Sequence, residues 1–89
     1  MKKFARLRSP DTGIAMTAAT DLPGVQVYSG NNILAEPGKG GRTYRARDAV
    51  CLETQHFPDS PNRPEFPSTV LRPGQPFRST TVFAFSVME

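Results

Sequence analysis

One carboxylate lies in the middle of an otherwise apolar run at residues 49–55, Ala-Val-Cys-Leu-Glu-Thr-Gln. Successive side chains of an extended strand point to opposite faces, so Glu53 shares a face with Cys51 and Gln55. A carboxylate in such a place either forms the polar side of a half-buried strand or works as a general base, because burial without a partner is costly. This run alone leaves both interpretations open.

A second polar group lies in the short extended run at residues 25–28, Val-Gln-Val-Tyr. The same alternation puts Gln26 and Tyr28 on one face. If this strand pairs with the Glu53 strand and their faces match, four side chains line one concave surface: Gln26, Tyr28, Glu53 and Gln55. Amides and carboxylates offer the paired donors and acceptors that suit sugar hydroxyls. A face of this kind would suit a sugar only if the two strands are in fact neighbours.

The elements that must position these groups are predicted to be strands. Residues 4–8 and 14–19 alternate in character on either side of Ser-Pro-Asp-Thr-Gly, which predicts a hairpin. Residues 80–87 show the clearest alternation, with a ring-bearing face expected to be core: Thr81, Phe83, Phe85 and Val87. The chain has nine prolines in 89 residues, and the six that are spread through its second half exclude a long helix there. We expect an all-β, antiparallel chain.

The charge and the glycines have simpler explanations than a nucleic-acid or nucleotide site. Eleven basic against eight acidic residues give a formal charge of +3, but eight of the eleven basic residues lie at the amino-terminal end and in a Gly-rich loop, without a nucleic-acid-binding motif. The run Pro-Gly-Lys-Gly-Gly at 37–41 lacks the spacing of a phosphate-binding loop. We expect residues 32–47 to form a flexible loop.

The remaining composition indicates compartment and cofactors. The single cysteine, Cys51, excludes an internal disulfide, and its apolar strand suits a buried, reduced thiol. We find no signal peptide, because charges and Pro10 interrupt the segment after Lys2 and Lys3, and no run long enough to cross a membrane. We expect a cytoplasmic protein with no metal site and no cofactor.

Five pieces of this chain, in order, resemble the carboxyl-terminal part of the aldose 1-epimerase (galactose mutarotase) family. They are P-G-V-Q-V-Y-S-G-N at 23–31, L-E-T-Q at 52–55, F-P-D-S-P-N-R-P-E-F-P at 57–67, L-R-P-G at 71–74 and T-T-V-F-A-F-S-V at 80–87. The resemblance runs from about residue 4 to residue 87. It implies that residues 1–89 form part of an antiparallel β-sandwich, the supersandwich of galactose mutarotases, which these strands alone leave incomplete.

The resemblance also implies a reaction, the interconversion of the α and β anomers of a free hexose such as galactose or glucose. The family's L-E-T-Q glutamate, here Glu53, is the catalytic base, and the family glutamine that matches Gln26 contacts the sugar. The family's acid is a histidine in a motif that does not occur here. His56 is the single histidine of this chain and lies at a position that the family does not use as the acid. We therefore interpret it as a loop residue.

Two functions from different classes follow. The chain is either part of an aldose 1-epimerase, inactive alone, or a non-catalytic carbohydrate-binding or vestigial module. A third class, a nucleic-acid-associated protein, is disfavoured for the reasons above. A sheet without its second layer leaves apolar side chains and strand edges in water, so we expect a homo-oligomer or a complex with a complementing chain.

Overall fold

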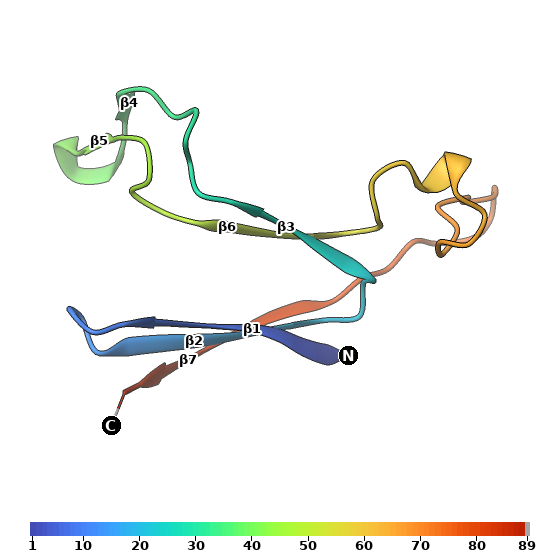
Figure 1. The fold of residues 1–89 in the computed structure, drawn as a ribbon, viewed down its shortest axis with the longest axis horizontal. Helices are drawn as coiled ribbons and strands as arrows, with labels where there is room; N and C mark the ends of the chain where they lie inside the picture. Colours follow the sequence, from blue (N-terminus) through green and yellow to red (C-terminus); the bar gives the residue numbers. More distant parts are fainter. Residues whose placement is uncertain (89) are drawn as a thin grey trace.

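A computed structural model of the chain describes residues 1–88, and its regular structure is almost entirely antiparallel strand (Figure 1). This confirms the all-β, antiparallel prediction. The strands are β1 (Lys2–Ser9), β2 (Ile14–Thr20), β3 (Gly24–Tyr28), β4 (Glu36–Pro37), β5 (Thr43–Tyr44), β6 (Cys51–Gln55) and β7 (Thr81–Val87). Two short 3-10 turns, Lys39–Gly41 and Ser60–Asn62, complete the elements.

The first sheet has three strands in the order β1-β2-β7. The predicted hairpin of β1 and β2 is confirmed, and its turn uses Gly13 at φ 75°, a backbone conformation that glycine adopts without steric cost. The amide of Gly13 donates to the carbonyl of Ser9 at 2.8 Å, which closes the turn. On the other side of β2, Met16 pairs with Phe85 and Ala18 with Phe83, so the face of β7 that carries the rings continues onto β2.

Two smaller sheets carry the rest of the strands. β3 pairs with β6, and β4 pairs with β5. The segment 32–47, which we expected to be one loop, therefore contains a two-residue ladder in which Glu36 lies opposite Tyr44. The Tyr44 ring covers Gly38, where an added Cβ would lie 2.4 Å from ring carbons, so this glycine is needed for close approach. Flexibility of the segment stays a prediction.

The sheet of β3 and β6 meets the three-stranded sheet through threonine hydroxyls. Thr54 Oγ1 on β6 and Thr81 Oγ1 on β7 lie 2.8 Å apart, and Thr81 Oγ1 lies 3.2 Å from Thr20 Oγ1 on β2. These hydrogen bonds join strands from both sheets where the ribbons come together (Figure 1). The odd-and-even alternation of β6 then fixes its orientation, because Leu52 and Thr54 face the three-stranded sheet and Glu53 faces away from it.

The face of β7 that carries the rings is not a core within these residues, in contrast to our expectation. Phe83 is 46% exposed, Phe85 70% and Val87 81%. The side chains that are buried are small, and Ala15 and Ala18 form the apolar core. The physical reason is that the sheet of β3 and β6 contacts this layer through the threonines at one end and leaves the rings uncovered. We call this side of β2 and β7 the ring face. Its side chains are Ile14, Met16, Phe83, Phe85 and Val87, of which Met16 is partly buried and the others are exposed.

The described part of the chain contains no helix that is long and apolar enough to cross a membrane.

Candidate functional site

Gln26 and Glu53 lie directly opposite each other in the ladder of β3 and β6. Directly opposite residues of an antiparallel pair have their Cβ atoms about 4.5–5.5 Å apart and point to the same side. The neighbouring pairs on that side are Gly24 with Gln55 and Tyr28 with Cys51. The expectation that the two polar strands are neighbours with matching faces is therefore confirmed, and we call the five side chains of this side the polar face: Gln26, Tyr28, Cys51, Glu53 and Gln55.

The polar face points away from the three-stranded sheet, because Thr54 points toward it. The side chains of Gln26 and Glu53 are exposed. The tyrosine of this face is fixed by the loop that follows it, since the amide of Asn32 donates to Tyr28 Oη at 3.0 Å. A small polar molecule such as a sugar can therefore approach the amide of Gln26 and the carboxylate of Glu53 from solvent at the same time.

Cys51 is exposed, so our expectation of a buried thiol is wrong. Its strand is apolar in composition, but Cys51 points to the same side as Glu53, where nothing within residues 1–88 forms a covering layer. An apolar composition alone does not distinguish a strand covered on both faces from a strand with one open face.

His56 follows β6 and belongs to a different environment. Its ring is partly buried and lies 6.4 Å, centroid to centroid, from the ring of Phe77 in the segment before β7. Both residues line a hollow of about 340 Å³ together with residues 68–71. This contact gives the imidazole a packing role, in agreement with its interpretation as a loop residue. Its part in the chemistry stays untested.

The sequence reasoning missed one contact at the end of the polar face. The ring of Phe57 lies against Gly24, where an added Cβ would come within 2.9 Å of two ring carbons. The signal was present, because a glycine opens the β3 segment and an aromatic residue follows β6. Neither residue type identifies its partner, however, until the register of the two strands is known.

Residues 1–88 contain no group of three or more histidine, cysteine, aspartate or glutamate side chains placed to hold a metal ion. The chemistry that the polar face offers is that of a carboxylate beside an amide. Such a pair can accept a proton from one sugar hydroxyl and hydrogen-bond another.

A family model described as aldose 1-epimerase matches residues 1–84. The chain belongs to the aldose 1-epimerase family. It is 47% identical over 88 residues to the galactose mutarotase of Mus musculus and 36% identical over 86 residues to the aldose 1-epimerase of Escherichia coli K12. These matches cover 97% and 94% of this chain but only 26% and 25% of the two relatives.

The fold agrees with this family. The structure superimposes on the GalM/aldose epimerase homologue from C. elegans with a TM-score of 0.87 and 31% identity, over 99% of this chain and 27% of that one. The chain thus spans about a quarter of the length of the relatives it matches. Its strands correspond to one part of an aldose epimerase fold.

Proposed function

We propose that these 89 residues supply the catalytic base and one sugar contact of an aldose 1-epimerase, with Glu53 as the base and Gln26 as the sugar ligand. The observation that carries the proposal is the cross-strand pairing of Gln26 with Glu53 on an open polar face. The matching quarter of named galactose mutarotases and aldose 1-epimerases supports it. An aldohexose is the proposed substrate, and the segment is the carboxyl-terminal part of the fold.

The reaction assigns a role to each group. The Glu53 carboxylate accepts the proton of the C1 hydroxyl, the bond from C1 to the ring oxygen breaks, and an acid protonates that oxygen. The open-chain aldehyde rotates about its C1–C2 bond and recloses on the other face, which regenerates both groups. Gln26 hydrogen-bonds the sugar and orients it beside Glu53. The acid is proposed to come from outside these residues, because their single histidine, His56, lies at a position that the family does not use as the acid.

The test is a graft into a complete relative. Residues 1–88 replace the matching quarter of the mouse galactose mutarotase, and polarimetry follows the anomerisation of fresh α-galactose. Glu53→Gln should lower kcat/KM by about 10²–10⁴, the usual contribution of a general base. Glu65→Gln, which removes an exposed carboxylate from the loop after β6, is the matched control and should leave the rate within about twofold of the parent.

Two results would reject the proposal. One is a Glu53→Gln graft that keeps the parent's rate. The other is acceleration by the ungrafted 89-residue chain that survives Glu53→Gln. Acceleration by that chain which His56→Ala abolishes would assign the acid to His56 and correct our interpretation of that residue.

The second candidate is a non-catalytic carbohydrate-binding module, favoured by the placement of the single histidine away from an acid's position. It requires saturable galactose binding by the 89-residue chain without anomerisation. Gln26→Ala should then weaken binding, whereas Glu53→Gln, which keeps hydrogen-bonding atoms of similar shape, should weaken it less.

Localisation and association complete the proposal. A single exposed thiol, Cys51, is compatible with a reducing compartment, and we propose the cytoplasm. The exposed ring face and the free outer edge of β7 favour a homo-oligomer or a complementing chain that covers them. We do not propose binding to nucleic acid or to a membrane.

A further inference from the structure

The register between β3 and β6 decides whether the proposed site exists. A slip of one residue moves every side chain of a strand to the opposite face, so Gln26 would leave the polar face and Val25 or Val27 would take its place. A two-stranded ladder with exposed side chains specifies its register weakly. Val27 is 57% exposed, which shows how little burial of the apolar face contributes to holding this ladder.

The contact between Phe57 and Gly24 discriminates between registers. The ring lies where the Cβ of residue 24 would be, at 2.9 Å from two ring carbons, and real Cβ atoms do not approach carbon so closely. Gly24 is the one residue of β3 without a Cβ, since the strand reads Gly-Val-Gln-Val-Tyr. Any slip of β3 that keeps the ring in place brings a side chain into the position that the ring occupies.

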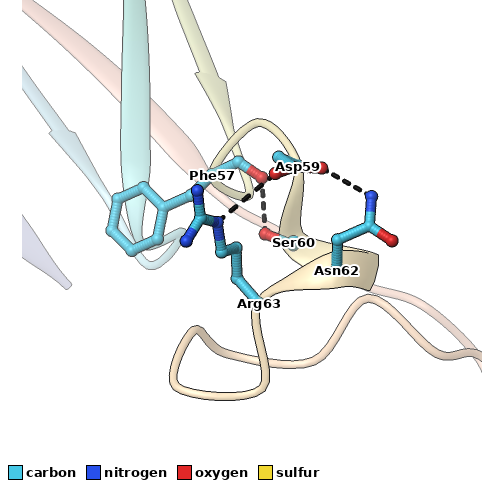
Figure 2. A network of polar contacts seen from close by, with 5 residues as sticks. All are labelled: Phe57, Asp59, Ser60, Asn62 and Arg63. Carbon is cyan, nitrogen blue, oxygen red and sulfur yellow. Dashed lines mark hydrogen bonds and ion pairs between the residues drawn. The ribbon is translucent and has the colours of Figure 1, made fainter.

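Phe57 is 36% exposed, and the loop that follows limits its movement through one contact to the ring and one to its backbone. Phe66 packs edge-on against it, with ring centroids 5.2 Å apart and an interplanar angle of 62°. The hydroxyl of Ser60 donates to the carbonyl of Phe57, and this contact ties the backbone of Phe57 to the 3-10 turn (Figure 2).

The turn is itself braced by Asp59. Its carboxylate accepts hydrogen bonds from Asn62 Nδ2 at 2.6 Å and from Arg63 Nε at 3.3 Å, and Figure 2 shows both contacts beside Phe57. Ser60 is buried, so the contact to the carbonyl of Phe57 is shielded from water. The loop between β6 and the next segment is therefore an ordered support for one ring.

We propose that Phe57 is a positioning residue that selects the register of β3 and β6 by seating its ring on Gly24. The contact of the Phe57 ring with Gly24, which we call the seat, keeps Gly24 opposite Gln55, and Gln26 then lies opposite Glu53. The importance of this role for catalysis rests on the proposed function, but the register itself is measurable without any activity. Phe57 acts on the placement of Gln26 and Glu53 only through the backbone of β3, at Gly24.

Disulfide trapping in the 89-residue chain tests the register. In a Cys51→Ser background, one variant carries Gln26→Cys with Glu53→Cys, which reports the observed register, and a second carries Val25→Cys with Glu53→Cys, which reports a slipped one. The first pair should oxidise readily and the second should not, because only residues with facing Cβ atoms can be bridged. Mass spectrometry of the tryptic fragments quantifies both bridges.

The seat is then tested by a double-mutant cycle in the same background. Gly24→Ala should reduce the yield of the bridge between positions 26 and 53 by at least about twofold relative to the slipped bridge, the smallest coupling typical of contacting residues. Phe57→Ala removes the ring from this position, so Gly24→Ala added to it should have no further effect. Gly24 has an ordinary backbone conformation, and alanine there is obstructed by the ring alone.

Two outcomes would overturn the proposal. One is a Gly24→Ala variant that traps the native bridge as the parent does, and the other is an equal loss from Gly24→Ala with and without Phe57. These outcomes are independent of the graft experiment. The register can prove correct while Glu53→Gln leaves the rate of the graft unchanged, which rejects only the proposed function. Equally, Glu53→Gln can lower the rate while Gly24→Ala leaves the register unchanged, which rejects only the role of Phe57. In the graft, Gly24→Ala and Phe57→Ala should each lower kcat/KM, and the double variant should lower it no further than Phe57→Ala alone.

Discussion

The exposed ring face predicts that the 89-residue chain associates, and Phe85→Ser is the substitution that tests it. Phe85 lies opposite Met16 at the centre of this face and is 70% exposed. Full burial of such a side chain is worth roughly 1.5–3 kcal/mol, so covering the exposed part is worth about 1–2 kcal/mol per copy. In a symmetric dimer that packs the two faces together, both copies contribute about 2–4 kcal/mol.

Loss of that burial should raise the dissociation constant of the dimer roughly 30- to 700-fold, since 1.4 kcal/mol is tenfold. Sedimentation equilibrium of the parent and the variant over a range of micromolar concentrations measures this ratio. The matched control is Val82→Ser, on the same strand but facing the other way and 45% exposed. It removes a β-branched side chain from β7 without touching the ring face, so its effect reports the strand's stability alone.

The prediction is refuted if the parent sediments as a single folded species of 9.8 kDa at micromolar concentration. It is also refuted if Phe85→Ser and Val82→Ser weaken association equally, because the ring face would then not be the contact. A complementing chain in place of a second copy would show as association only after that chain is added, and Phe85→Ser should weaken it as well.

Two further predictions concern stability, measured by urea unfolding at one fixed protein concentration. Thr20→Val should cost about 1–3 kcal/mol, because the buried Thr20 hydroxyl donates to the carbonyl of Thr80 and accepts from the amide of Leu22, both at 3.2 Å; a cost below about 0.5 kcal/mol would contradict this. Asp59→Asn should be nearly neutral, since the pair with Arg63 is exposed, whereas Asp59→Ala should cost about 1–2 kcal/mol because residue 59 has φ 66°. Equal effects of the two Asp59 variants would show that the charge, and not the backbone, decides.

The strands were predictable because their signal is local. Alternation of polar and apolar residues identified β2, β3, β6 and β7 to within one or two residues, and the turn before β2 followed from its proline and glycine. The sequence also predicted that Gln26 and Glu53 share one polar surface, on the condition that their strands pair with matching faces. What the pattern could not supply was the covering layer of each apolar face.

The ring face illustrates that limit. Phe83 and Phe85 carry the strongest apolar alternation in the chain, and that alternation indicates which side avoids water in a complete fold, not what covers it in these residues. Cys51 fails for the related reason that an apolar run does not specify how many of its faces are covered. The seat of Phe57 on Gly24 was out of reach because it joins residues whose proximity depends on the register itself.

One face of β6 contacts the rest of the fold, and the other face carries the proposed catalytic base. Thr54 joins the sheets through Thr81, whereas the carboxylate of Glu53 makes no hydrogen bond or ion pair with any group in residues 1–88. Glu53→Gln therefore removes no contact that stabilises this part of the fold, and a loss of rate in that variant reads as a loss of proton transfer. Besides the ladder itself, the contact of Phe57 with Gly24 keeps Gln26 opposite Glu53, and Thr54 holds β6 against β7. A defect there would instead lower the rate by moving an intact carboxylate, and only the register measurement separates the two causes.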